Sequence, residues 1–260
     1  MQDAMKKKEI ECQTNILILF RKLREGLLAS GRKDAFALEV YETSLYLSIL
    51  FGCSVAQDMP TAILSHLQNM YNSNASCMST STTTTTIHLL HLLLMGYPSQ
   101  QAYFDRLKTL TSRSNTTQEG APSSWIRALA RALLRYDFIT FDVLSQVDAF
   151  ERSHSCPPSC GSTTTGRSIA MGPFDDLAKA TVSTLLARLR SKARGTAWSV
   201  MKGAYRVVSV SDQKEEWVGR YLVLDGASRA DVETWMEERS RVGDAILERG
   251  GWWKIGRGRR

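Results

Sequence analysis

The chain has 260 residues, of which 43% are hydrophobic and 23% are charged, and its five cysteines are odd in number and scattered. This length can bury a sizeable core, and the cysteines do not form a disulfide framework, so a reducing compartment is favoured. No apolar run approaches the ~20 residues of a membrane span, and the N-terminus lacks a secretory pattern. The formal net charge of +7 favours an acidic partner such as nucleic acid.

The first 150 residues are predicted to form a helical array. Apolar residues recur at spacings of three and four from Ile16 to Leu28, which indicates one apolar stripe. Two polar tracts interrupt the array: residues 72–86, rich in Ser and Thr, are predicted to be a mobile loop, and residues 111–124 a second loop. Further helices are predicted over about residues 34–51, 61–71, 87–97, 99–110 and 125–147.

Residues 151–172 are rich in Pro, Gly, Ser and Thr and are predicted to be a flexible linker. A long helix is predicted from Pro173 to about Val207.

The last fifty residues change character. A short β-prone stretch follows the long helix, then a helix that Ser211 can cap, a helix that begins at Ser228 with Asp231 as a capping box, and a hairpin at a Gly-Gly turn. Strand, helix, helix, hairpin is the order of a winged helix. The expected fold is therefore mainly α: TPR-like antiparallel helical repeats over residues 1–150, the linker 151–172, a long helix over 173–207 that completes the array, and a winged helix over 208–260.

One stretch, GSTTTGRS at residues 161–168, is one residue away from the phosphate-binding loop pattern. The pattern needs a strand before the loop and a lysine within it, but a proline-rich segment precedes it and Arg167 replaces the lysine. His154, Cys156 and Cys160 are too few for a structural zinc site. No catalytic constellation can be assembled from the four histidines, so neither an enzyme, a cofactor nor a metal is expected.

Basic residues gather in the last third of the chain. No acidic residue stands between Lys179 and Arg206, so this helix surface is a candidate for contact with phosphates. The candidate nucleic-acid-binding residues are Arg188, Arg190, Lys192, Arg194, Lys202, Arg206, Arg239, Arg241, Arg249, Lys254 and Arg257. Trp252 and Trp253 are adjacent on a predicted strand and should point to opposite faces, one into the core and the other toward a base or a protein partner.

Four stretches, in order, resemble the GANP-type, leukocyte-receptor-cluster-like branch of the PCI-domain proteins. They are FRKLREGLLASGRKDAFALEVYETSLYLSIL from Phe20, LSHLQNMY from Leu64, IRALARALLRYDFITF from Ile126 and MKGAYRVVSVS from Met201. In the first stretch, the resemblance lies in Phe20, Leu23, Arg24, Leu27, Phe36, Leu38, Val40, Tyr41, Glu42 and Thr43.

The resemblance implies a non-enzymatic scaffold subunit in nuclear mRNA processing and export, located in the nucleus or also in the cytoplasm. It implies pairing with another PCI-domain subunit and contact with RNA or DNA through the winged-helix region, with no membrane partner. The alternative is a protein-binding PCI subunit of the proteasome lid or a related complex. A nucleotide-dependent enzyme that uses the loop at Gly161 is the least favoured interpretation.

Overall fold

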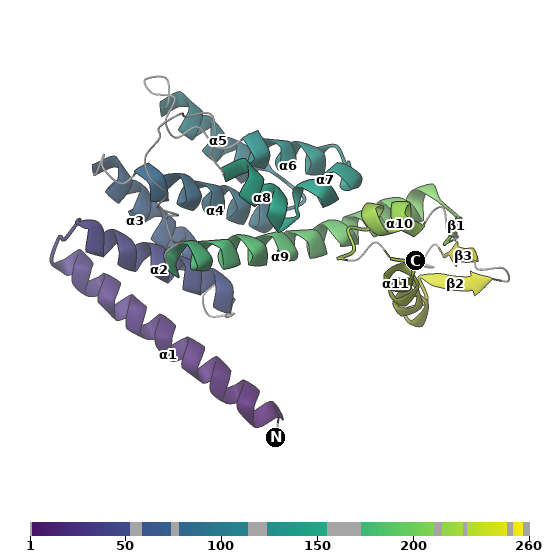
Figure 1. The fold of residues 1–260 in the computed structure, drawn as a ribbon, viewed down its shortest axis with the longest axis horizontal. Coiled ribbons are helices and arrows are strands. Elements are labelled where there is room, and N and C mark those ends of the chain that lie inside the picture. Colours follow the sequence, from purple (N-terminus) through teal and green to yellow (C-terminus); the bar gives the residue numbers. More distant parts are fainter. Residues whose placement is uncertain are drawn as a thin grey trace, which may run out of the picture. The chain divides into compact units, whose positions relative to one another are not determined.

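A computed structural model of the chain is shown in Figure 1. Over the described residues the protein is mainly helical, with eleven helices and one sheet of three strands. This confirms the mainly α class that the sequence predicts. The described residues are 2–52, 59–73, 78–113, 124–154, 173–210, 215–225, 228–248 and 252–256.

The chain divides into two compact units that interleave along the sequence. Unit 1 comprises Met1–Leu92, Ala102–Pro122 and Pro157–Leu185, and unit 2 comprises Leu93–Gln101, Ser123–Cys156 and Leu186–Arg260. The helices α4 (Met78–Gly96) and α9 (Pro173–Ala204) contribute residues to both units. The composition change at residues 151–172 does not indicate this division, because composition does not show which helices pack together.

Unit 1 has its core around α2. This helix spans Ala35–Phe51. The other helices of unit 1 are α1 (Gln2–Ala29), α3 (Met59–Ser73), most of α4, α5 (Gln101–Arg113) and the first part of α9. The carboxylate of Asp34 caps α2 by accepting from the backbone N–H of Ala37 at 3.0 Å. Gly52 ends the helix at φ +55°, a conformation that glycine adopts without strain. Because α2 packs against both α1 and α3, Leu45 and Ile49 are buried.

The prediction of one apolar stripe on α1 was wrong. Leu17 and Leu27 are buried, but Leu19, Leu23 and Leu28 are exposed. Figure 1 shows that α1 runs beside α2 at its C-terminal end and projects beyond it at its N-terminal end. The apolar residues of α1 therefore face two directions, and only one of these is used by the fold.

The prediction of a loop over residues 72–86 was also wrong for residues 72–73, which end α3, and for residues 78–86, which form the first half of α4. Thr84 and Thr86 are buried within this helix. The Thr86 hydroxyl donates to the carbonyl of Thr82 at 3.0 Å, so it is satisfied inside the helix. Thr84 Oγ1 accepts from Tyr71 Oη at 3.0 Å. Packing and local hydrogen bonds thus outweigh the modest helix propensity of threonine.

Unit 2 contains three short helices where one helix over residues 125–147 was expected: α6 (Ser124–Leu134), α7 (Phe138–Leu144) and α8 (Val147–His154). The first break falls at Tyr136, whose φ is +56°. Asp137 then caps α7 by accepting from the N–H of Thr140 at 3.0 Å. Trp125 Nε1 donates to the carbonyl of Leu144 at 2.9 Å, which ties the start of α6 to the end of α7.

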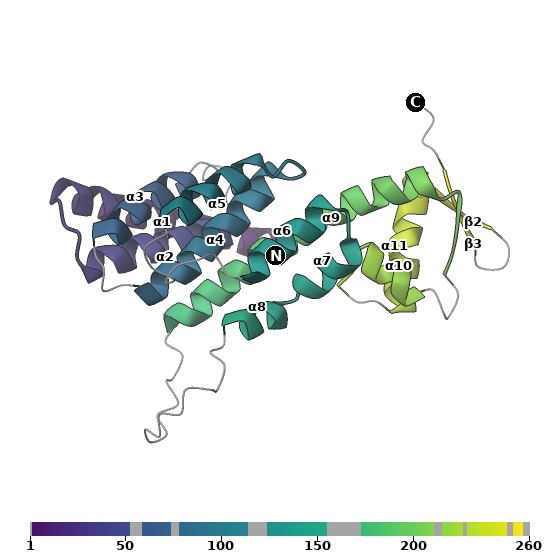
Figure 2. The ribbon, with the colours of Figure 1, turned by 90° about the horizontal axis from the view of Figure 1, so that it is seen from above.

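The C-terminal elements of unit 2 follow the predicted order of strand, helix, helix and hairpin (Figure 2). They are β1 (Val207–Ser209), α10 (Glu215–Tyr221), α11 (Arg229–Arg241), β2 (Ala245–Glu248) and β3 (Trp252–Ile255). The strands form one antiparallel sheet in the order β1-β3-β2. Ser228 caps α11 as predicted, accepting from the N–H of Asp231 at 3.3 Å. Residues 151–154 of the predicted linker 151–172 form the end of α8, so the prediction was wrong for them. Residues 155–172 and Ser211 lie outside the described residues.

Candidate nucleic-acid interface

The basic residues of α9 do not share one face. Arg188 and Lys192 are exposed, Arg194 is half-buried and Arg190 is buried. The Lys192 ammonium donates to the carbonyl of Leu94 at 2.7 Å, so part of its hydrogen-bonding capacity is used inside unit 2. The row of cations in the sequence therefore separates into surface and interior residues once the helix forms.

Arg190 is a structural residue, which corrects its assignment to phosphate contact. Its Nη1 lies 2.8 Å from Asp142 Oδ1 and donates to Ser145 Oγ at 2.6 Å, and its Nη2 donates to the carbonyl of Leu224 at 2.9 Å. Because the Nη1 hydrogens point at Ser145 and at the backbone carbonyl of Asp142, the contact with the Asp142 carboxylate is electrostatic. Burial raises the pKa of Asp142, and the charge of Arg190 offsets part of that rise.

Arg194 contacts the same turn as Arg190. Its Nη2 donates to the carbonyl of Val223 at 2.8 Å and lies 3.4 Å from Asp225 Oδ2. Val223 has a φ of +54°, a conformation that a β-branched residue rarely adopts. The two arginines of α9 thus satisfy the carbonyls of the turn at residues 222–225, which ends α10. This turn, not a phosphate, accounts for the position of Arg194.

Lys202 and Arg239 are also engaged within unit 2. Lys202 Nζ lies 3.2 Å from Asp244 Oδ1, and Trp198 Nε1 donates to Asp244 Oδ2 at 3.1 Å. Burial alone would raise the pKa of Asp244, but the hydrogen bonds from Trp198 and Lys202 outweigh burial and lower it. The guanidinium of Arg239 sits over the ring of Trp235 at 5.2 Å. Trp198 and Lys202 thus join α9 to the residue that precedes β2, and the ring of Trp198 lies edge-on to Trp235 of α11 at 4.8 Å.

The remaining candidate cations fall into two groups. Arg206 and Arg241 are exposed, and Lys254 is exposed with Glu248 across the sheet at 3.6 Å. Arg249 and Arg257 lie outside the described residues. The exposed arginines Arg188, Arg206 and Arg241 therefore remain candidates for electrostatic contact with phosphates.

Trp252 and Trp253 point to opposite faces of the sheet, as predicted. Trp253 is 4% exposed and Trp252 is 45% exposed. Trp253 pairs with Val208 on the inner face, so its assignment to partner binding was wrong. On the outer face, Trp252 is accompanied by exposed Val207 and Ile246.

A row of aromatic side chains in unit 2 was not found from the sequence. Tyr205 lies edge-on to Trp217 at 6.0 Å, Trp217 stacks on Tyr221 at 5.4 Å, and Tyr221 lies edge-on to Phe138 at 5.4 Å. Tyr205 and Trp217 are 43% and 37% exposed, whereas Phe138 is buried. We call Tyr205, Trp217 and Tyr221 the aromatic row. One signal was available, because Trp217 and Tyr221 are four residues apart in a predicted helix.

Exposed arginines occur beside the aromatic row in the sequence. Arg206 follows Tyr205 directly, and Arg220 precedes Tyr221 on α10. Arg220 forms an exposed ion pair with Glu216 at 2.6 Å, and such pairs contribute little and are readily exchanged. Exposed rings together with arginines are typical of surfaces that bind single-stranded nucleic acid.

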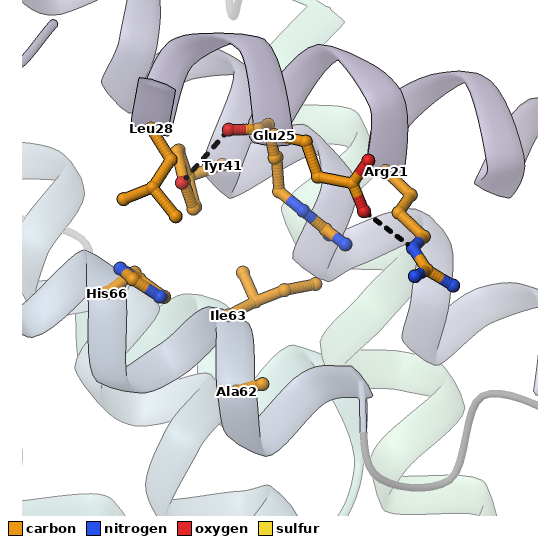
Figure 3. Close-up of a pocket in the computed structure, with 8 residues that line it drawn as sticks. Arg21, Glu25, Leu28, Tyr41, Ala62, Ile63 and His66 are labelled. Atoms are coloured by element: carbon orange, nitrogen blue, oxygen red, sulfur yellow. Dashed lines mark hydrogen bonds and ion pairs between the residues drawn. The ribbon is translucent and has the colours of Figure 1, made fainter. Parts of the chain in front are cut away.

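A cleft in unit 1 lies between α1 and α3 (Figure 3). Figure 3 shows Arg21, Glu25 and Leu28 of α1 facing Ala62, Ile63 and His66 of α3, with Tyr41 between them. The cavity has a volume of about 240 Å³ and adjoins a second of about 220 Å³. Tyr41 Oη donates to the carbonyl of Arg24 at 3.5 Å, and burial raises the pKa of this phenol. Neither cavity reaches the ~300 Å³ typical of small-ligand sites, so we assign no reaction to the cleft.

The remaining motifs give no further site. The loop at residues 161–168, Cys156 and Cys160 lie outside the described residues. In the described part of the chain, no group of three His, Cys, Asp or Glu residues is placed to hold a metal ion. Within the same part, none of the helices combines the length and apolarity needed to cross a bilayer.

Comparison of the chain with known family models, curated proteins and solved structures finds no match. The resemblance to PCI-domain proteins therefore rests on the four stretches of sequence alone.

Proposed function

We propose that the chain is a non-enzymatic scaffold subunit of the PCI type that acts in nuclear mRNA processing and export. In this proposal its helical region, built of TPR-like repeats, pairs with another PCI subunit. Its C-terminal region, folded as a winged helix, contacts nucleic acid. The sequence resemblance supports the family, and the residues of unit 2 support the nucleic-acid contact.

The observation that supports nucleic-acid binding best is the aromatic row. Tyr205 and Trp217 present partly exposed rings, and every base offers a π-face on which such a ring can stack. Arg206 adds a charge that can meet the phosphate backbone. Duplexes hide the faces of their bases, so this arrangement favours a single-stranded RNA over a duplex.

The aromatic row shifts the expected contact away from the hairpin. The sequence placed most of the C-terminal cations and both tryptophans of the hairpin at the interface. In unit 2, Trp253 is in the core and Lys254 faces Glu248, whereas Trp217 and Tyr205 are exposed on the elements before the hairpin. The junction of α9, β1 and α10 is therefore the proposed contact surface.

The test is binding of a single-stranded RNA of about fifteen nucleotides, measured by fluorescence anisotropy at several salt concentrations. Loss of one stacking ring should weaken binding about 5- to 100-fold, so Trp217→Ala and Tyr205→Ala should both fall in that range. Trp252→Ala is the matched control, because Trp252 is exposed to a similar degree but lies on the sheet. Arg206→Ala should reduce the slope of log affinity against log salt by about 0.7.

Two results would overturn this proposal. One is a wild-type chain that binds no RNA at about 0.05 M salt, where screening is weak. The other is a folded Trp217→Ala variant with wild-type affinity. If Trp252→Ala alone weakens binding, the contact lies on the hairpin, as the sequence first indicated.

The second candidate is a protein-binding PCI subunit of the proteasome lid or a related complex. The outer face of the sheet favours it, because Trp252, Val207 and Ile246 expose apolar surface there. Affinity purification of the tagged chain followed by mass spectrometry separates the two candidates. Recovery of lid subunits would replace the mRNA-processing proposal, and recovery of mRNA-processing proteins would support it.

A further inference from the structure

α1 has an apolar stripe that the fold does not use. Met5, Leu19 and Leu23 are 67%, 64% and 40% exposed, Cys12 is exposed, and Ile16 is half-buried. Their spacings are seven, four, three and four residues, so the helix places them within an arc of roughly 60°. The stripe therefore runs straight along one side of α1.

This stripe runs beside the side of α1 that packs in unit 1, and the half-buried Ile16 lies at the border between the two. Leu17 and Leu27 are buried, and α1 contacts α2. Every side chain from Asp3 to Cys12 is exposed. In Figure 1 the N-terminal part of α1 projects past α2. An exposed apolar stripe on a projecting helix is typical of an interaction surface.

The stripe follows the heptad spacing of helices that pack side by side. Ile16 and Leu23 take one core position with Glu9, and Met5, Cys12 and Leu19 take the other. We call these six residues the α1 seam. The residues that flank it carry positive charge or none: Lys6, Lys8, Gln13, Asn15, Phe20 and Lys22.

The charges of these flanking residues determine which kind of helix can pack on the α1 seam. A second copy of α1 in parallel would place Glu9 against Glu9, and in antiparallel it would place Lys8 against Lys22 at both ends. Like charges in these positions oppose pairing. Acidic residues at the flanking positions of another helix would instead meet Lys6, Lys8 and Lys22.

We propose that the α1 seam is a docking site for an acidic amphipathic helix of a partner protein. The apolar residues of that helix pack on Leu19, Leu23 and Ile16, and its carboxylates pair with the flanking lysines. Glu9 fixes the register, because the partner must place a polar or basic residue opposite it. The site lies in unit 1 and is independent of the RNA contact proposed for unit 2.

The test uses two synthetic peptides of about three heptads with leucine and isoleucine at the core positions, except for one lysine at the core position that faces Glu9. Alanine at the outer positions keeps each peptide helical in isolation. One peptide has glutamate at the flanking positions and the other has lysine. Binding of each to the full chain is measured by fluorescence anisotropy. The glutamate peptide should bind at least tenfold more tightly, and its advantage should shrink at high salt because the flanking pairs are exposed.

Variants locate the binding face. Leu19→Asp should weaken binding of the glutamate peptide at least tenfold, because it places a charge in the middle of the seam. Ile18→Asp is the matched control: Ile18 is 46% exposed and neighbours Leu19, but it lies off the seam. It should leave binding within about twofold. Trp217→Ala should also leave it unchanged, which keeps this test separate from the RNA test.

Three outcomes would overturn the proposal. Equal binding of the two peptides would show that charge does not select the partner. An equal loss of peptide binding in the Ile18→Asp and Leu19→Asp variants would show that the seam is not the binding face. Self-association of the chain in sedimentation velocity, abolished by Leu19→Asp, would show that the seam is an interface between copies instead.

Discussion

Replacing Arg190 by methionine tests whether this arginine is structural. The change removes the cation beside Asp142 and the donors to Ser145 Oγ and the Leu224 carbonyl. Asp142 is buried, so the variant leaves a desolvated carboxylate without its counter-charge. Removing one partner of a buried ion pair costs about 3–5 kcal/mol. Because whole domains are stable by only about 5–15 kcal/mol, we expect a large fall in the urea midpoint.

Two further variants isolate the ion pair. Arg188→Met removes an exposed arginine two residues away and should change stability by less than about 0.5 kcal/mol. Adding Asp142→Leu to Arg190→Met removes the stranded carboxylate and should restore much of the lost stability. An Arg190→Met variant no less stable than Arg188→Met would refute the structural assignment. A double variant less stable than Arg190→Met alone would refute the role of Asp142.

The same variant has a defined pH dependence. Burial already raises the pKa of Asp142 above its ordinary value of 3.8, and Arg190 offsets part of that rise. Without Arg190 the pKa rises further, so the folded state binds a proton that the unfolded state releases. That stabilisation is present below pH 3.8 and is lost as pH rises through the folded pKa. The loss of unfolding free energy in Arg190→Met relative to the wild type should therefore be smaller at pH 5 than at pH 7. An equal loss at the two pH values would contradict this reasoning.

Two other variants test particular contacts of the fold. Asp244→Asn should cost about 1–2 kcal/mol at pH 7, since it weakens a charged hydrogen bond with Lys202. Because the pKa of Asp244 is lowered, this contribution should be present above pH 3.8 and should fade as pH falls through the folded pKa, which urea titrations at pH 7 and pH 3 can check. Thr84→Val removes a buried hydroxyl that lies in hydrogen-bonding distance of Tyr71 Oη and Glu42 Oε1, and it should cost about 1–2 kcal/mol even though Tyr71 still donates to Glu42. Thr83→Val, on a less buried position of α4, should be nearly neutral, and thermal melts of the two variants can check this.

Features set by neighbouring residues were predictable from the sequence. Ser228 and Asp231 are three residues apart, and capping geometry follows from that spacing alone. Trp252 and Trp253 are adjacent on a strand, and the pleat sends adjacent side chains to opposite faces. Tyr136, which interrupts the helix expected at residues 125–147, shows the limit of this reasoning. Its positive φ is stabilised by the backbone hydrogen bonds of the surrounding turn. A tyrosine at that position does not predict a positive φ.

Features set by distant residues were not predictable. The polar tract of α4 is helical because Thr84 meets Tyr71 and Tyr46 from other helices, and a polar composition does not reveal such partners. Likewise, the number of basic residues in the sequence of α9 does not show which of them pairs with an acidic residue in the folded chain. Arg190 and Asp142 are 48 residues apart, so only the folded chain shows that they form a pair.

The burial of Arg190 changes which experiment can test nucleic-acid binding. Reversing the charges of Arg190 and Arg194 would release the carbonyls of the turn that ends α10, and α10 positions Trp217 in the aromatic row. Such a variant would lose RNA binding whether or not either arginine touches a phosphate. Exposed cations that make no such contacts, above all Arg206, are the informative positions, because their removal changes the surface charge and leaves the aromatic row in place.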